Sequence, residues 1–340
     1  MQTQVTIRDV ARLADVHPGT VSRALNPETR GLVNNATAER VLAAADELGY
    51  RPNSMARGLK TNRSLTIGVL IPDLTNPLFP PIVRGIDDRL TIDGYTPLLV
   101  NTGNDPDRER ASIEAMLARQ VDGFIAATAQ LDVEPLSVAI GRGLPVVLVN
   151  RTFEDASMSA CTVDDLKGSA LAVEHMVGLG HERIGYVAGP QNVSTGHRRY
   201  LGFVQAMEAA ALPVLAERVS YAAAFTEEEG AQACAEVLRA DPAVTAIITA
   251  NDRLAIGCYD TLFERGLNCP DDVSIIGFND MMFIDRLRPP LSSVRVPQRE
   301  LGYAAADLLL EQLSEKAPPA HEVMLEPTLV ARGSTAPLRS

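Results

Sequence analysis

Cysteine is scarce in this sequence, and its spacing limits what the chain can be. The 340 residues include four cysteines, which stand singly and form no C-x-x-C pair: Cys161, Cys234, Cys258 and Cys269. Structural zinc sites and disulfide frameworks need cysteines at short, regular spacings. The sequence therefore predicts neither, and we expect four reduced thiols with a structural role.

Long apolar runs are also absent. No stretch approaches the ~18 uninterrupted apolar residues that a membrane span needs. The N-terminal segment, MQTQVTIRDVARLADV, lacks the basic start and the apolar block of a signal peptide. We therefore expect a cytoplasmic protein that has no membrane partner.

The usual signatures of nucleotide binding and catalysis are missing too. There is no G-x-x-x-x-G-K-S/T loop, and the pair Gly178 and Gly180 lacks the third glycine of a dinucleotide-binding turn. The five histidines are scattered, without a recognisable metal pair or a nucleophile beside them: His17, His175, His181, His197 and His321. The sequence therefore predicts no catalytic residue, no metal site and no cofactor.

The residues that are present describe a large globular chain with an uneven charge. At 46% apolar and 22% charged residues, the chain is long enough for two or three folding units. Residues 1–63 contain nine Lys and Arg against six acids, a net charge of +3. Because the whole chain has a net charge of −12, residues 64–340 carry −15. A basic head on an acidic body indicates a nucleic-acid binder, although many solvated segments show a similar excess.

The basic head predicts three short helices. Thr6 and Asp9 have the spacing of a capping box, and Pro18 suits the first turn of a second helix. Asn34 is placed to cap a third helix, which ends before Gly49. The predicted helices cover roughly 6–14, 19–26 and 34–48. A tight turn between the first two is typical of a helix-turn-helix, but this spacing also fits an ordinary three-helix bundle.

Longer motifs decide between these alternatives by resemblance. Those of the head are TIRDVARLADVHPGTVSRALN and AERVLAAADELGYRPNSMARGLKTNRS, and those of the body are IGVLIPDLTNPLF, VDGFIAAT, GHERIGYVAGP, TANDRLAIG and IIGFND. In this order they closely resemble the lactose repressor/galactose repressor (LacI/GalR) family of transcriptional regulators. The resemblance covers nearly the whole chain. It implies a helix-turn-helix headpiece over 1–50, a hinge over 51–64 and a ligand-binding body over 65–340.

The resemblance also implies which headpiece residues meet DNA. Arg23 is the natural partner for guanine O6 and N7, whereas Gly19 has no side chain with which to read a base. Asp15 stands where the family usually has glycine, and aspartate is among the few residues that tolerate a left-handed turn. The predicted headpiece contacts are Thr6, Pro18, Gly19, Thr20, Ser22, Arg23, Asn26, Asn34 and Tyr50.

The hinge is predicted to contact DNA as well. About eight residues after Pro52 could be helical, which is below the ~12–15 residues at which isolated helices become stable. In the family this segment becomes helical on the operator, and a leucine from each copy wedges into the minor groove; Leu59 matches that position. Docking of Leu59 on the body is the alternative. The predicted hinge contacts are Asn53, Ala56, Leu59 and Lys60.

The body alternates apolar runs rich in β-branched residues with helical segments. Such alternation predicts an α/β fold with doubly wound parallel sheets. The clearest strands are Thr66–Pro72, Pro97–Asn101, Gly123–Thr128, Val146–Asn150, Arg183–Gly189, Ala246–Ala250 and Val273–Phe278. Two similar runs of units predict two lobes, one at about 65–163 and 295–323 and the other at about 164–294 and 324–340. The resemblance implies the same periplasmic-binding-protein-like body, closing on a small molecule.

Ten body residues match the ligand contacts of the family. Most follow the carboxyl ends of strands, where open α/β sheets bind ligands. The predicted contacts are Asn76, Leu78, Phe79, Thr128, Asn150, Thr195, Arg199, Phe225, Asn251 and Asn279. Their rings and donors favour a sugar or a sugar acid, and Asn279, where many sugar-binding relatives carry aspartate, favours the acid. Turn formation at strand ends is the alternative role for the asparagines.

These features together predict a transcriptional regulator, most simply a repressor. Two heads of a homodimer would bind a near-palindromic operator, and a small effector between the lobes would control operator affinity. We expect a dimer because no leucine heptad follows the body. One alternative is a sugar receptor without gene control, and the missing signal peptide and the helix-turn-helix head argue against it. The other is a doubly wound enzyme, which has only the fold in its favour. The sequence leaves open whether the effector induces or corepresses.

Overall fold

The computed structural model describes residues 5–26, 29–50, 63–128, 134–153, 158–314 and 316–339. The chain divides into two compact units, residues 1–64 and residues 65–340. The predicted hinge contacts Asn53, Ala56, Leu59 and Lys60 lie outside the described residues. Among the described residues, no helix is both long enough and apolar enough to cross a membrane.

The described residues of the first unit form three short α-helices, each begun by a local signal. The N–H and Oγ1 of Thr6 donate to the Asp9 carboxylate at 2.9 and 2.7 Å, which makes the predicted capping contact. His17 Nδ1 accepts the N–H of Gly19, and Asn34 Oδ1 accepts the N–H of Ala36 at 3.0 Å. The elements are α1 (Ile7–Leu13), α2 (Pro18–Leu25), the 3-10 helix η1 (Arg30–Leu32) and α3 (Asn35–Glu47).

The turn between α1 and α2 requires an unusual backbone conformation. Asp15 lies there with a φ of +50°, the left-handed region that glycine and a few polar residues adopt. The three helices then pack around a core of small side chains, in which Val10, Val21 and Val41 are fully buried among alanines. The helix-turn-helix therefore closes as the sequence predicts, with aspartate in the turn.

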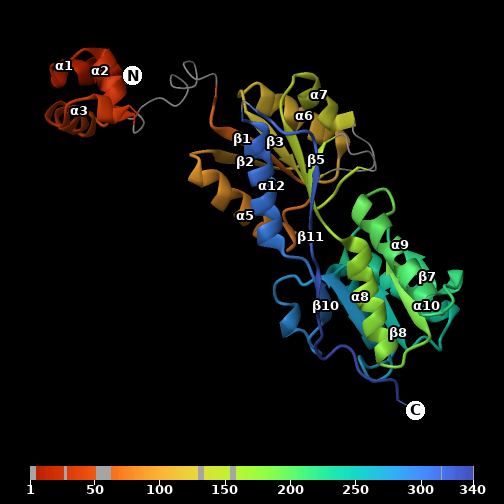
Figure 1. The fold of residues 1–340 in the computed structure, drawn as a ribbon. Helices are drawn as coiled ribbons and strands as arrows, with labels where there is room; N and C mark the ends of the chain where they lie inside the picture. Colours follow the sequence, from red (N-terminus) through yellow and green to blue (C-terminus); the bar gives the residue numbers. More distant parts are fainter. Residues whose placement is uncertain are drawn as a thin grey trace. The chain divides into compact units, whose positions relative to one another are not determined.

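The second unit contains two six-stranded sheets (Figure 1). The first has the order β11-β5-β4-β3-β1-β2, and its strands are β1 (Thr66–Ile71), β2 (Thr96–Asn101), β3 (Gly123–Ala126), β4 (Val146–Val149), β5 (Ser159–Val163) and β11 (Glu322–Leu325). The second has the order β12-β10-β9-β8-β6-β7, and its strands are β6 (Ile184–Ala188), β7 (Val219–Tyr221), β8 (Ala246–Thr249), β9 (Ser274–Asn279), β10 (Ser292–Arg295) and β12 (Thr328–Val330). Within the described residues, the strand pairs are parallel except for β10 with β12.

Helices cover both faces of each sheet, as parallel strands require. In β1, Val69 packs in the core formed with α5, whereas the next residue, Leu70, packs with Ile113 and Met116 of α6 on the opposite face. The helices of the first lobe are α5 (Phe79–Ile92), α6 (Pro106–Leu117), α7 (Glu134–Gly141) and α12 (Gln298–Gln312). Those of the second are α8 (Asp165–Gly178), α9 (Ser194–Ala209), α10 (Glu227–Ala240) and α11 (Asp252–Glu264), with the 3-10 helices η2 (Ala216–Arg218) and η3 (Ile284–Arg286).

Helices α5 and α12 pack backbone to backbone. A Cβ atom on Gly85 would lie 2.0 Å from the carbonyl oxygen of Arg299, and one on Gly302 would lie 1.9 Å from that of Ile82. Only glycine permits such an approach. These two helices, which are over 200 residues apart in sequence, thus form one continuous layer on the first sheet (Figure 1).

The chain crosses between the lobes three times. It leaves the first sheet after β5, returns as α12 and β11, and crosses again to form β12. Strand β11 pairs with β5 as far as Leu325, so the first lobe extends two residues beyond the predicted boundary at 323. Likewise, Arg295 ends β10 in the second sheet, although the sequence-based boundary assigned it to the first lobe. Both shifts arise because strand pairing continues to the end of each crossing segment.

Candidate ligand pocket and nucleic-acid interface

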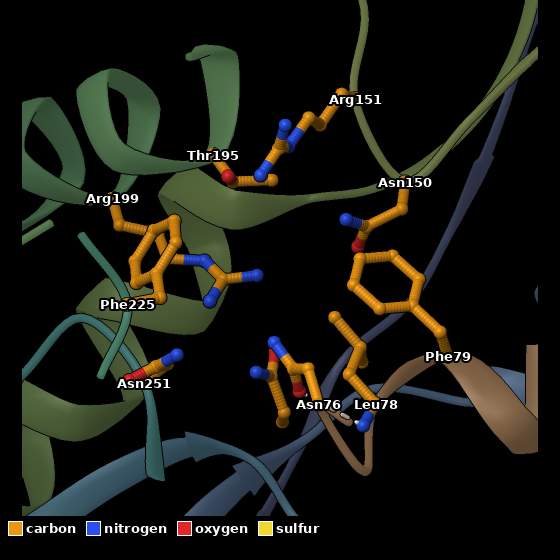
Figure 2. A pocket seen from close by; sticks show the side chains of 10 residues that line it. Asn76, Leu78, Phe79, Asn150, Arg151, Thr195, Arg199, Phe225 and Asn251 are labelled. Atoms are coloured by element: carbon orange, nitrogen blue, oxygen red, sulfur yellow. Dashed lines mark hydrogen bonds between the residues drawn. The ribbon is translucent and has the colours of Figure 1, made fainter. Parts of the chain in front are cut away.

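A small polar pocket lies between the two lobes of the second unit. Asn76 follows β1 and Asn150 follows β4 in the first lobe, while Asn251 follows β8 and Asn279 ends β9 in the second. The carboxyl ends of both sheets therefore face the same space, as open α/β sheets require of a ligand site. The lining residues, shown in Figure 2, are Asn76, Leu78, Phe79, Asn150, Arg151, Thr195, Arg199, Phe225, Asn251 and Asn279.

The structure brings nine of the ten predicted ligand contacts into this pocket. Thr128 is the exception, because its buried hydroxyl donates a hydrogen bond to Glu109 on α6 and does not line the space. Arg151 is the converse case: it lines the pocket, and the sequence did not single it out. Its position directly after Asn150, beyond a buried strand, is the signal that could have found it.

Arg199 is fixed on the second lobe by three contacts. Its Nε donates to Asp165 Oδ1 and its Nη1 to the carbonyl oxygen of Ala250, each at 2.7 Å. Its guanidinium carbon lies 3.8 Å from the centre of the Phe278 ring. Burial raises the pKa of Asp165, and the adjacent guanidinium opposes that rise. These hydrogen bonds use Nε and Nη1. Nη2 can therefore donate to a ligand, and Figure 2 shows the guanidinium pointing into the pocket.

The asparagines combine structural bonds with free polar atoms. Asn251 Oδ1 caps α11 by accepting the N–H of Leu254 at 2.9 Å, and Asn76 Oδ1 accepts the N–H of Leu78 at 3.1 Å. For these two oxygens, turn and cap formation is thus a real role. Asn279 differs, because its Oδ1 is buried without a hydrogen-bond partner among the described residues. A buried acceptor in that state indicates a missing donor.

Two phenylalanines complete opposite walls of the pocket. Phe79 begins α5 and is buried, and Phe225 lies half-buried in the segment before α10. The Phe225 ring lies directly against Gly189, where an added Cβ would come within 2.3 Å of it. Figure 2 shows the two rings on either side of the space. Flat apolar surfaces beside hydrogen-bonding groups suit a ligand that has both a C–H face and hydroxyl groups.

Arg151 is buried in the pocket wall with few partners. It is 6% exposed, its Nη1 donates to Asn104 Oδ1 at a long 3.4 Å, and its Nε has no hydrogen-bond partner among the described residues. Burial lowers its pKa to about 10; Glu109 opposes this effect, and the like charge of Arg199 adds to it. The site therefore holds a positive charge that is poorly compensated.

A larger hollow adjoins the pocket and shares Asn76, Phe79, Arg151 and Phe225 with it. There Arg253 of α11 contacts Asp73 of the first lobe at 3.3 Å and Glu227 of the second at 2.6 Å. The Ser194 hydroxyl also accepts the N–H of Thr152 across the lobes at 3.0 Å. The two lobes thus meet through polar contacts around the pocket, and its shape depends on their relative position.

The headpiece exposes a polar face on α2. Ser22 and Arg23 are exposed, and Pro18, Gly19, Thr20 and Asn26 are half-buried on the same short helix and its end. Thr6 and Asn34 are exposed but also act as caps. Tyr50 is half-buried, and burial raises its pKa. All nine predicted headpiece contacts therefore have surface that DNA could reach.

Within the part of the chain that the structure describes, no three His, Cys, Asp or Glu side chains gather into a group that could hold a metal ion. The acids near the pocket have other partners. Asp165 pairs with Arg199, and Asp252 accepts hydrogen bonds from Ser293 and from the N–H of Met281.

Comparisons with known proteins place this architecture in a family. Residues 6–53 match the model "Bacterial regulatory proteins, lacI family", and residues 173–335 match "Periplasmic binding protein-like domain". The HTH-type transcriptional repressor CytR of Escherichia coli (strain K12) is 33% identical over 339 residues, which cover 99% of this chain and 98% of CytR. The chain belongs to the LacI family. It is a DNA-binding transcriptional regulator with a ligand-binding domain, as the sequence predicted.

Solved structures of LacI-family proteins share the fold. The lac repressor dimer, bound to operator and to the anti-inducer ONPF, aligns with a TM-score of 0.86 and 27% identity, over 98% of this chain and 100% of that one. A LacI-family regulator from Enterococcus faecium with bound ribose aligns with a TM-score of 0.72 and 33% identity, over 81% and 100% of the two chains. The predicted fold, a helix-turn-helix headpiece with a two-lobed α/β body, is confirmed.

Proposed function

We propose that this LacI-family chain is a homodimeric repressor that binds a near-palindromic operator and releases or retains it according to a small polar effector, a sugar or a sugar acid. The headpiece would read the operator through α2, with Arg23 on a guanine, and the body would hold the effector between its lobes. Such a protein needs no catalytic group, and it would act in the cytoplasm, where its operator DNA lies.

The exposed polar face of α2 supports the DNA-binding part of this proposal. In a helix-turn-helix the second helix enters the major groove, and a dimer places two such helices about one helical turn of DNA apart. Ser22 and Arg23 are fully available for this contact. The lac repressor, which shares the fold over 98% of this chain, was solved as a dimer on its operator.

The composition of the pocket carries the ligand part of the proposal. Side chains of both lobes, among them two phenylalanines, four asparagines and Arg199, line one small space. Solved relatives of this chain hold ribose and cellobiose, molecules with apolar faces and many hydroxyl groups. A ligand that contacts both lobes favours one relative position of the lobes, which is the differential binding that a switch requires.

A ligand screen followed by operator binding tests the proposal. A ligand at 100 times its Kd raises stability by ~2.7 kcal/mol, so thermal unfolding with sugars, sugar acids and nucleobases reports which class binds. Each ligand found this way is then added to a gel-shift titration on an operator that is selected from random DNA by the protein itself. We expect the ligand to change operator affinity, and operator occupancy must change ligand affinity by the same factor. Ligand binding without that coupling would refute the switch.

A further inference from the structure

The least satisfied group in the pocket wall is the guanidinium of Arg151. This residue is 94% buried, and among the described residues its Nε has no hydrogen-bond partner and its Nη1 makes only the long bond to Asn104. An arginine has five N–H donors and stays charged in proteins, so a buried one is normally paired with carboxylates or carbonyl groups. Figure 2 shows the side chain extending from the loop after β4 toward Thr195.

The charges around the pocket do not balance. Of the described residues that line it, two are arginines and none is an aspartate or a glutamate. The charge of Arg199 is matched by Asp165 at 2.7 Å, but among the ion pairs of the described residues Arg151 takes part in none. The carboxylate of Glu109 interacts electrostatically with Arg151. However, Glu109 already accepts a hydrogen bond from Thr128, and burial raises the pKa of Glu109. Within the part of the chain that the structure describes, the charge of Arg151 is therefore left without an ion-pair partner.

We propose that the effector carries an oxyanion, a carboxylate or a phosphate, which binds the free guanidinium edge of Arg151. The inference rests on the proposed function, because it takes the pocket between the lobes to be the effector site. It narrows the ligand class to small polyhydroxylated anions, meaning sugar acids or sugar phosphates. The two phenylalanine rings would hold the C–H faces and the asparagines would hold the hydroxyl groups.

Desolvation of Arg151 favours an anionic ligand. Closing the lobes on a neutral sugar leaves a buried charge with hydroxyl partners only, and an uncompensated buried charge is strongly unfavourable. An oxyanion accepts two parallel N–H bonds from a guanidinium in a geometry that hydroxyl groups do not match. Asn279 presents an amide and not a carboxylate that would repel an acidic ligand, and its Oδ1, which lacks a donor among the described residues, would accept from a hydroxyl group of the same ligand.

Matched pairs of ligands test the proposal on the full-length protein. Gluconate, glucuronate and glucose 6-phosphate are compared with glucose, and ribonate and ribose 5-phosphate with ribose, by calorimetry. We expect at least one anion to bind tenfold or more tightly than its neutral partner. The carboxylate and phosphate members of each series show which oxyanion the site takes. Tighter binding of the neutral sugar in both series would overturn the inference.

Substitution of Arg151 then assigns the effect to this side chain. Arg151→Gln should weaken binding of the anion roughly 10- to 100-fold, the worth of a charge-assisted contact, and change binding of the neutral partner less than about threefold. Arg151→Lys, which keeps the charge, should retain part of the preference. Arg142→Gln is the control, because this exposed arginine lies in the same lobe away from the pocket. Equal losses for anion and neutral sugar would contradict the proposal.

The gel-shift readout separates this inference from the proposed function. If neutral sugars alter operator affinity and the anions do not, the proposed function stands and the oxyanion inference is refuted. An anion that binds through Arg151 without altering operator affinity would support the site and contradict the switch. If no member of either series binds or alters operator affinity, both proposals fail.

Discussion

The headpiece and the body place their polar side chains differently. Among the described residues, every buried polar or charged side chain lies in the body, and the headpiece core contains only valine and alanine. The headpiece turns its polar groups outward toward a partner with an extended surface. The body encloses them around a small space. A contact in the headpiece can therefore be judged by exposure, whereas one in the body must be judged by whether its partners satisfy it.

Removing the buried ion pair of the body should have the largest effect. Arg199→Ala leaves Asp165 as an uncompensated buried carboxylate, so we expect a loss of about 3–5 kcal/mol of unfolding free energy together with loss of ligand binding. Chemical denaturation and calorimetry measure the two effects. The double substitution Arg199→Ala with Asp165→Asn should recover much of the stability and none of the binding. A single variant as stable as the wild type would contradict this structural role.

Removing an exposed arginine of the headpiece should leave stability almost unchanged. Arg23→Ala should weaken operator binding by ~1–3 kcal/mol and relax specificity at one symmetric base pair. The free energy of unfolding should change by less than about 0.5 kcal/mol. Gel-shift titration against single-base variants of the operator measures this. Arg40→Ala, an exposed arginine on α3, serves as the comparison. A uniform loss over all sequences would identify Arg23 as a phosphate contact.

A headpiece cap should have the smallest effect, and a purely local one. Asn34→Ala removes the acceptor for the N–H of Ala36 and should destabilise the headpiece by about 1 kcal/mol. Hydrogen exchange of the amides in α3 reports this without interference from the body. Asn35→Ala changes the next exposed asparagine, which is the first residue of the helix, and should have little effect. Faster exchange throughout the body would show that the two units are not separate.

Local signals made the headpiece the more predictable of the two units. The capping contacts of Thr6 and Asn34 and the left-handed Asp15 depend on residues within three positions of each other. In the body, apolar runs predicted β1, β2, β3, β4, β6, β8 and β9 but not β5, β7, β10, β11 or β12. Strand β10 reads Ser-Ser-Val-Arg, and its buried serines are satisfied by Ser334 and Asp252, which are far away in sequence. Hydropathy does not detect a strand of that kind.

The pocket was predictable where strand ends and family motifs coincide. Two residues show the limit. Thr128 follows a strand as the others do, but Glu109 on another helix takes its hydroxyl. Arg151 directly follows Asn150, so its place beside the pocket could be read from the sequence, but its burial could not. Long-range packing decides both the hydroxyl partner of Thr128 and the burial of Arg151.

The late return of the chain to the first lobe has a consequence for folding during synthesis. Helix α12, which packs backbone to backbone on α5, and strand β11, which borders β5, follow the whole second lobe in sequence. Strand β12 likewise completes the second sheet last. Domains generally fold from the N-terminus as they leave the ribosome, and contacts between distant segments form slowly. Here the first lobe must wait with its α5 face uncovered, so the nascent body is expected to need chaperone protection until its final strands emerge.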